Sequence, residues 1–408
     1  MSGMGKAPTT SSQVIISAFR AALVHQSLII LGVLAALAVL GAAWRARRGG
    51  HPGAASPRGA GPRGAGPRGA GPRDAGPRDA AARWAIAEPG GRRLLRIGFG
   101  ILWLFDGLLQ AQPMMPVRLA DEVTVPSAGD SPVWVRHLVH GAGTLWNAHP
   151  IAAATAAVWI ELGIGAWMLA APRGTLSRLA GMVGAAWGLV VWVFGEAFGE
   201  IFAPGLNWAS GAPGAVMFYL AAGVLVALPD NWWAGRRAAR GILAAMGAFL
   251  TGMAVLQSWP GRGSWQGDGG PLTAMIQEMA QTPQPHFLAR LVSGFASFNA
   301  AHGVAVNLTI VIVLAATGLA LLPGHQPTAR AAVAVAWAFC LATWVLAQDL
   351  GFFGGVGTDP NSMIPILLIL TAGYVALAHP PAPMSAPATP VRPWWEGLKL
   401  KLGAPVQR

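Results

Sequence analysis

NAHPIAAATAAVWIELGIGAWMLAAPRGTLSR (147–178) is the stretch that decides the fold class of this chain. Its apolar run, 151–171, is long enough to cross a bilayer as a helix, and a short basic turn follows at once. The chain of 408 residues is 54% apolar and 11% charged, whereas soluble domains carry about 25% charged residues. Because so few charges cannot cover a water-facing surface, we expect an all-α polytopic membrane protein.

Similar apolar runs recur along the rest of the chain and predict about nine transmembrane helices in total. The further runs lie at residues 22–39, 95–112, 179–195, 212–229, 241–257, 303–323, 331–348 and 363–379. The first is too long, and too far from any small-residue cleavage site, to be a signal peptide, so we expect it to remain as a spanning helix.

The chain also repeats itself. The stretch 147–178 aligns with AAHGVAVNLTIVIVLAATGLALLPGHQPTAR (300–330). Further on, WVFGEAFGEIFAPGLNWASGAP (192–213) aligns without a gap with WVLAQDLGFFGGVGTDPNSMIP (344–365). The matched pairs include His149 with His302, Gly165 with Gly318, Trp192 with Trp344, Gly199 with Gly351, Ser210 with Ser362 and Pro213 with Pro365. Such matches predict two tandem four-helix bundles in the same orientation, preceded by one N-terminal helix.

These patterns divide the chain into five segments. An N-terminal transmembrane helix (1–44) precedes a Pro-Arg-Gly-Ala linker (45–91) that we expect to be disordered and to lie against anionic lipid, a nucleic-acid arm being the alternative. The two repeats cover 92–230 and 231–380, and the tail 381–408 carries a Trp- and Lys-containing segment expected at the membrane surface. The net charge of +12 lies mainly in connections, so the lipid bilayer is the expected partner and nucleic acid is not.

The charged connections predict the orientation. Alternate connections are basic, with Arg173, Arg178, Arg236, Arg237, Arg240 and Arg330, and those between them are acidic. Short basic loops remain in the cytoplasm, so we expect the N-terminus outside, the C-terminus cytoplasmic and any site at the outer face. The excess of Arg over Lys, with abundant Ala, Gly and Pro, is typical of a GC-rich bacterial genome, which places the protein in a bacterial plasma membrane.

Two stretches resemble a known family. WIELGIGAWMLAAPRGTLSRLAG (159–181) resembles the second-to-third helix segment of the DoxX family, and RRLLRIGFGILWLFDGLLQ (92–110) is similar to its first helix. The resemblance covers 92–230 and, more weakly, 236–379. It implies a four-helix membrane unit, like the DoxD-type subunit of thiosulfate:quinone oxidoreductases, with quinone as the ligand and a redox partner protein that carries the cofactor.

Acidic residues in apolar helices are the candidate site residues. A carboxylate at the bilayer centre costs about 3 kcal/mol unless protein or water satisfies it, so such residues are often functional. The predicted substrate-binding residues are Asp106, Glu161, Glu196, Glu200, His149 and Trp192. We expect the first three to share one cavity that opens outward beside 196–213. The alternative is structural: each acid would bond to a neighbouring helix or lie at a solvated helix end, and His149 would make an interfacial hydrogen bond.

The second repeat lacks these acids. Aligned with Asp106, Glu161, Glu196 and Glu200 are Thr251, Leu314, Gln348 and Phe352. We therefore expect the first repeat to hold the working site. In the second repeat, GVGTDPNSMIP (355–365) reads as a turn-rich connection, with ligand binding as the alternative.

Neither a catalytic nor a metal-binding residue is predicted. His137 and His140 share a helical face in an amphipathic segment (133–146), but no third ligand is near them in sequence, and Cys340 is the one cysteine. Nucleotide, haem and hydrolase motifs do not occur in the sequence. The favoured function is a redox-complex subunit without its own cofactor, the alternative is a small-molecule or ion transporter, and whether the protein is an enzyme is left open.

Overall fold

The computed structural model describes residues 9–49, 88–204 and 206–380. Every regular element within these residues is a helix, which confirms the all-α class. Most of the predicted linker and the whole predicted tail, 381–408, lie outside the described residues.

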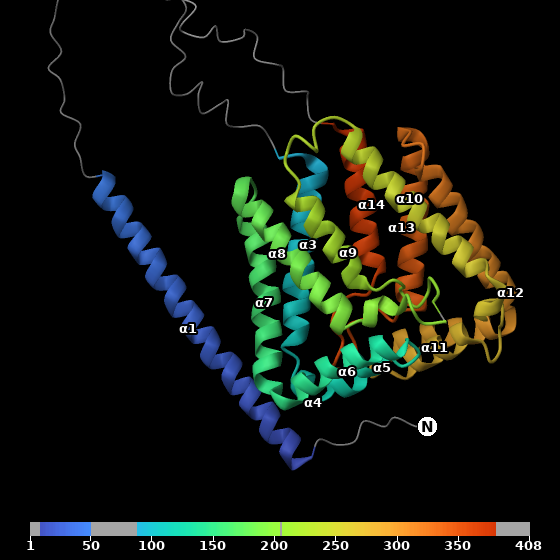
Figure 1. Ribbon diagram of the computed structural model, residues 1–408, viewed down its shortest axis with the longest axis horizontal. Coiled ribbons are helices and arrows are strands. Elements are labelled where there is room, and N and C mark those ends of the chain that lie inside the picture. The colour runs from blue at the N-terminus through green and yellow to red at the C-terminus, as the bar shows by residue number, and fades with distance from the viewer. Residues whose placement is uncertain (1–8, 50–87, 205, 381–408) are drawn as a thin grey trace, which may run out of the picture.

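Each predicted apolar run coincides with a helix (Figure 1). Listed in chain order, these helices are α1 (Thr10–Gly49), α3 (Gly90–Gln110), α7 (Pro150–Ala170), α8 (Gly174–Phe194), α9 (Ala215–Ala227), α10 (Arg237–Ser258), α12 (His286–Leu321), α13 (Gln326–Leu346) and α14 (Met363–Ala378). In the described part of the chain, six of them are long and apolar enough to cross a membrane: α1, α7, α8, α10, α12 and α13. Together they indicate a multi-pass membrane protein.

The remaining three apolar helices are short or bent. The helix α3 passes the same test only together with the segment Met115–Ser127, after a bend of 84°. The helices α9 and α14 have 13 and 16 residues, or about 20–24 Å at 1.5 Å per residue, against a hydrocarbon core of about 30 Å. Irregular chain precedes both, and much of it is buried in protein, which is the condition under which membranes tolerate such backbone.

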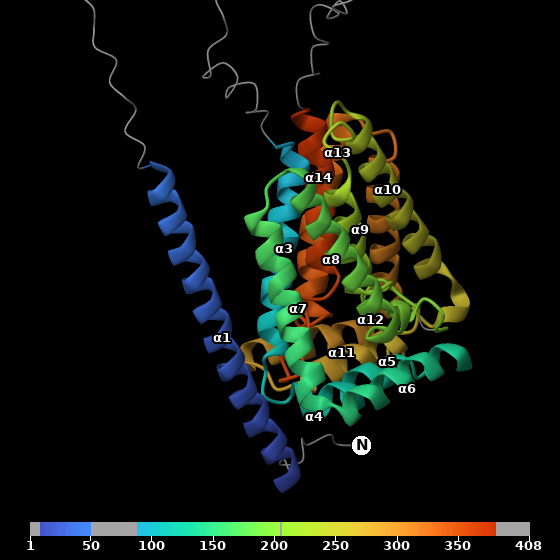
Figure 2. The ribbon, with the colours of Figure 1, turned by 60° about the vertical axis from the view of Figure 1, so that its left-hand side comes forward.

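Short helices lie across one end of the bundle, opposite the end where α1 ends, α3 begins and α14 ends (Figures 1 and 2). They are α4 (Met115–Leu119), η1 (Ala120–Thr124), α5 (Val125–Ser127), α6 (Val133–Ala148) and α11 (Pro271–Gln281). The amphipathic segment predicted at 133–146 is therefore a helix, α6, which exposes most of its side chains.

The two halves pack their helices in the same order. In the first, α3 contacts α7, α7 contacts α8, α8 contacts α9 and α9 returns to α3; in the second, α10, α12, α13 and α14 make the same four contacts. The helix α14 also packs against α3 and α9 and so joins the halves.

A histidine marks the same break in each half. His149 separates α6 from α7 with φ −135° and ψ 53°, because Pro150 excludes the helical conformation from the residue before it. His302 has φ −128° and ψ 28°, but Gly303 follows it, so α12 continues through a kink as one 36-residue element. The predicted helix at 303–323 is therefore the second part of a longer helix.

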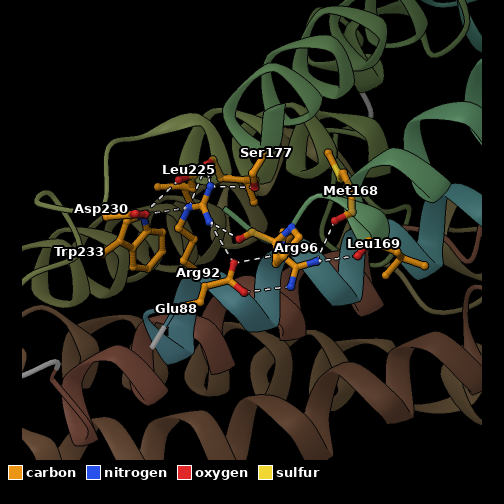
Figure 3. A network of polar contacts seen from close by, with 11 residues as sticks. Glu88, Arg92, Arg96, Met168, Leu169, Ser177, Leu225, Asp230 and Trp233 are labelled. Carbon is orange, nitrogen blue, oxygen red and sulfur yellow. Dashed lines mark hydrogen bonds and ion pairs between the residues drawn. The ribbon is translucent and has the colours of Figure 1, made fainter. Parts of the chain in front are cut away.

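Two buried arginines hold the end of the first half that lies away from α6 (Figure 3). The Arg92 guanidinium donates to the carbonyl oxygen of Val226 at 2.9 and 3.1 Å, and Arg96 donates to that of Met168 at 2.8 Å. These carbonyls belong to the last turns of α9 and α7, where helix carbonyls lack intrahelical partners and positive charge is favourable. Glu88 lies between the guanidinium groups and accepts from both at 2.9 Å.

We predict that Glu88→Gln strongly destabilises the protein. The Glu88 side chain is 6% exposed, and replacing it with Gln leaves Arg96 without a counter-charge and Arg92 with only the exposed Asp230, which costs about 3–5 kcal/mol. Asp230→Asn is the control, because Asp230 is 58% exposed at 3.7 Å from Arg92, and exposed pairs contribute at most about 1 kcal/mol. Thermal unfolding in detergent measures both, and equal losses would contradict the prediction.

Candidate functional site

A cavity of about 790 Å³ lies between α3, α7 and α8 in the first half. The π-helical turn η1 and the helix α6 cover it, so it lies at the end of the bundle away from the start of α3 (Figure 2). Its wall is mostly apolar and aromatic, with a few polar groups. Such a wall is typical of a site for a small organic molecule.

Four carboxyl groups line this cavity. Asp106 comes from α3, Glu161 from α7 and Glu196 from the turn after α8, so the three acids expected to converge do so. Asp359 comes from the connection between α13 and α14, which belongs to the other half. That these groups bind a ligand stays a prediction, but their common location is observed.

Asp106 and Glu161 are each 4% exposed and incompletely bonded. The Glu161 Oε1 accepts a long hydrogen bond of 3.4 Å from Trp187 Nε1 of the neighbouring α8, whereas its Oε2 has no partner in the described residues. The Oδ1 of Asp106 likewise has none, although the Tyr219 hydroxyl lies close to this carboxyl group. The structural alternative therefore leaves at least two of the four oxygens of these two acids without a partner in the described residues.

Further polar atoms of the wall lack protein partners. Trp103 Nε1, Trp146 Nε1 and Gln110 Oε1 are buried, line the cavity and make no hydrogen bond within the part of the chain that the structure describes. A buried unsatisfied group costs about 1–3 kcal/mol, and most such groups are bonded to protein or water. Their concentration around one cavity leaves both donors and acceptors available there to water or to a ligand.

Glu196 reaches the cavity because of the turn in which α8 ends. Ala197, Phe198, Gly199 and Glu200 all have positive φ, between 49° and 61°, and this left-handed turn begins directly after Glu196, two residues beyond the end of α8 at Phe194. Its carboxylate accepts a hydrogen bond from the backbone N–H of Val216, in the first turn of α9, where negative charge is favourable. Despite this bond, burial and the nearby Asp359 raise the pKa of Glu196 well above its ordinary range.

Asp359 is held by its own loop. Its Oδ1 accepts from the backbone N–H of Asn361 at 2.7 Å, and its Oδ2 accepts from the Thr358 hydroxyl at 2.8 Å. Burial nevertheless raises the pKa of this carboxyl group. The turn predicted at GVGTDPNSMIP is thus present, and it also places an acid in the cavity of the other half.

Three of the six predicted site residues lie outside the cavity lining. Glu200 faces Asp130, and burial raises its pKa; His149 is exposed at the break before α7. Trp192 donates from Nε1 to the Pro213 carbonyl at 2.8 Å, because it follows the cavity-lining Val191 and so projects from another face of α8. Their predicted binding roles have no support from the geometry.

The structure corrects one of the predicted pairings between the halves. A Cβ added to Gly165 would lie 2.8 Å from the backbone nitrogen of Leu104, and a Cβ added to Gly318 would lie 2.7 Å from that of Thr251. Thr251 therefore occupies the place of Leu104, two residues before the counterpart of Asp106. The predicted match of Asp106 with Thr251 was wrong because the sequences of α3 and α10 have no shared motif that fixes their alignment.

With this correction the second half is still free of acids at the matching places. The counterparts are Met253 for Asp106, Leu314 for Glu161 and Gln348 for Glu196. Both apolar side chains are buried. The expected difference between the halves is thus present in the packing as well as in the sequence.

His137 lines the cavity, but His140 does not. Among the described residues, no group of three or more His, Cys, Asp or Glu side chains is placed to hold a metal ion. Comparison of the chain with protein families, with curated proteins and with solved structures finds no match.

We predict that a rise in pH above about 4 destabilises the folded protein through the cavity acids Glu196 and Asp359. Above the ordinary carboxyl pKa of about 4 the unfolded chain loses its protons, while Glu196 and Asp359 keep theirs in the fold until their raised pKa values are passed. Stability from these two groups is therefore fully present at acid pH and lost as the pH rises. Thermal unfolding between about pH 4 and about pH 8 should show a smaller fall for the Glu196→Gln/Asp359→Asn variant.

The control for this pH series is Glu278→Gln, which changes an exposed acid on α11. It should leave the pH dependence of the wild-type protein unchanged. A double variant whose unfolding temperature falls as steeply as that of the wild type would contradict the assignment to the cavity.

Proposed function

We propose that this protein binds a quinone or quinol in the cavity of its first half, as a DoxX-like membrane subunit of a redox complex. The observation that carries the proposal is one cavity in which an apolar, lipid-accessible wall meets buried carboxyl and indole groups without protein partners. A quinone has the matching parts, an apolar tail and a polar ring.

The cavity opens among apolar side chains on the surface of α6, α7 and α8. Residues that both line the cavity and expose more than a third of their surface are Leu138, Leu145, Ile160, Val190 and Phe194. In a bilayer, these side chains face lipid. A lipid-soluble molecule can therefore enter from the membrane without crossing water.

The polar groups inside suit the chemistry of a quinol. Oxidation of a quinol releases two protons and two electrons, and Asp106 and Glu161, each in its carboxylate form, can take up one proton apiece. The indole N–H groups of Trp103 and Trp146 can donate to the oxygens of the resulting quinone. The electrons would pass to a partner protein, because the sequence contains no cofactor-binding motif.

Transport is the second candidate, since carboxyl groups in membrane helices also relay protons. On the side of the cavity toward Gly90, however, the core is closed by fully buried side chains, among them Leu95, Phe99 and Met168. Beyond them lies the bonded cluster of Glu88, Arg92 and Arg96 (Figure 3). A ligand would have to open both layers to cross, which favours binding over transport.

The proposal includes nine spans and a tandem duplication. It is supported by the matching helix order of the halves and by the basic α7–α8 and α9–α10 connections at the end of the bundle away from α6. The N-terminus is then outside, the C-terminus is cytoplasmic in a bacterial plasma membrane, and the cavity lies in the outer half.

We predict that cysteine labelling in intact cells confirms this orientation. Asp130, between α5 and α6, and Arg173, between α7 and α8, are both exposed at opposite ends of the bundle, and Cys340 is 1% exposed. An impermeant maleimide should label Asp130→Cys in intact cells and Arg173→Cys only after lysis. The reverse result would invert the proposed topology.

We predict that Ala157→Phe prevents quinol binding. Ala157 lies buried in the cavity wall, so the larger ring occupies the binding volume, and the affinity should fall by at least about tenfold. Ala152→Phe is the matched control, because Ala152 is exposed on α7 and does not line the cavity. Equilibrium dialysis of a short-chain quinol against detergent-purified protein measures both variants, and equal affinities would contradict the site.

Transport is tested separately in reconstituted vesicles. Under an imposed proton gradient, the protein should not accumulate solute. If the wild type shows proton-linked uptake and the Glu161→Gln variant does not, the proposed function is overturned and the protein is a transporter.

A further inference from the structure

The two irregular connections between helices cross from one half into the other. In the connection between α8 and α9, the backbone N–H of Trp208 donates to Gln257 Oε1 of α10 at 3.0 Å. In the connection between α13 and α14, the Gly357 carbonyl accepts from Gln112, just after α3, at 3.1 Å. Each half therefore receives a segment of the other at the same end of its first helix.

The indole ring of Trp208 fills the interior of the second half. It is 0% exposed and stacks on Phe339 with ring centroids 5.8 Å apart and an angle of 15° between the planes. Phe249 lies 6.3 Å away on α10. The Trp208 Nε1 has no partner in the described residues, so stacking and apolar contacts keep the indole ring in place.

The same place in the first half is part of the cavity. Phe339 lies five residues before Trp344, and Trp187 lies five residues before the matching Trp192, so Trp187 is the counterpart of Phe339. Trp187 is half-buried and lines the cavity. The second half thus contains a flat two-ring group where the first half contains space.

Neighbouring residues explain why the place of the Trp208 indole is filled in the second half and the matching place in the first half is open. In the gapless alignment of the two connections, Pro360 stands where Trp208 stands, so this position brings no aromatic ring into the first half. Leu314 replaces Glu161, whose Oε1 accepts from Trp187. The filled place has a buried leucine in the position of Glu161, and the open place has carboxyl groups for a ligand with oxygen atoms.

From this comparison we infer that the cavity binds a flat two-ring quinone, a naphthoquinone, stacked on Trp187 as the Trp208 indole stacks on Phe339. The inference rests on the proposed function and narrows its substrate class, because a one-ring benzoquinone covers less of the Trp187 face. The ring oxygens lie toward Asp106 and Glu161, and the tail leaves between α7 and α8.

The test compares a naphthoquinone and a benzoquinone with the same short prenyl tail, each by equilibrium dialysis against detergent-purified full-length protein. The wild type should bind the naphthoquinone about tenfold more tightly, equivalent to about 1.4 kcal/mol. Trp187→Phe should keep this preference, as Phe339 holds the indole in the second half, and Trp187→Leu should abolish it.

A second variant tests the comparison of the halves directly. Pro360→Trp should place an indole over Trp187 and abolish binding of both quinones, whereas Pro360→Ala should bind as the wild type does. The Pro360 carbonyl, which accepts from Trp344 Nε1 at 2.7 Å, is kept in both variants, and thermal unfolding checks their fold.

The outcomes separate the inference from the function. Equal affinities for the two quinones in the wild type, or a preference that survives Trp187→Leu, would overturn the naphthoquinone inference and leave quinone binding intact. Normal binding by a folded Pro360→Trp protein would also overturn the inference. Failure of the wild type to bind either quinone would overturn the proposed function itself.

Discussion

The cavity depends on a constraint that lipid places on irregular backbone. In hydrocarbon, peptide groups without helical partners must be buried in protein, so the connections after α8 and α13 cannot remain at the lipid surface. Each is accommodated by entering the opposite half, where side chains such as Gln257 and Gln112 bond to it. Neither half is therefore a closed unit, and the acid that completes the first cavity comes from the second half.

Helical periodicity explains how much of this structure the sequence predicts. The apolar runs locate the helices, and the cost of charge in lipid identifies Asp106 and Glu161 as unusual, since both belong to such runs. Glu200 was less predictable because it lies in the turn after α8, where the left-handed residues redirect the chain. No rule of spacing gives the direction of a side chain across such a turn.

Contacts between distant segments were beyond what one sequence shows. Asp359 lies far along the chain from Glu196, and only the folded connection brings it to the cavity. The alignment of the repeats did contain a signal, because Asp359 matches Asn207, the neighbour of Trp208. Using that signal required knowing that each connection enters the other half. The Thr251 pairing failed for a related reason, since only helix contacts fix the register of α3 against α10.

The helix α1 has a consequence for how the protein sits in its bilayer. At about 1.5 Å per residue its 40 residues extend about 60 Å, roughly twice the hydrocarbon thickness of about 30 Å. Its N-terminal half packs against the bundle through the buried Phe19, and Trp159 Nε1 donates a 2.6 Å hydrogen bond to Gln26 Oε1. Residues further along α1, such as Leu34 and Leu40, are exposed. Figure 1 shows α1 beside the bundle. A change in membrane thickness alters helix tilt. In this protein α1 can tilt about its packed N-terminal half, so a change in membrane thickness changes the tilt of α1 and the bundle keeps its shape.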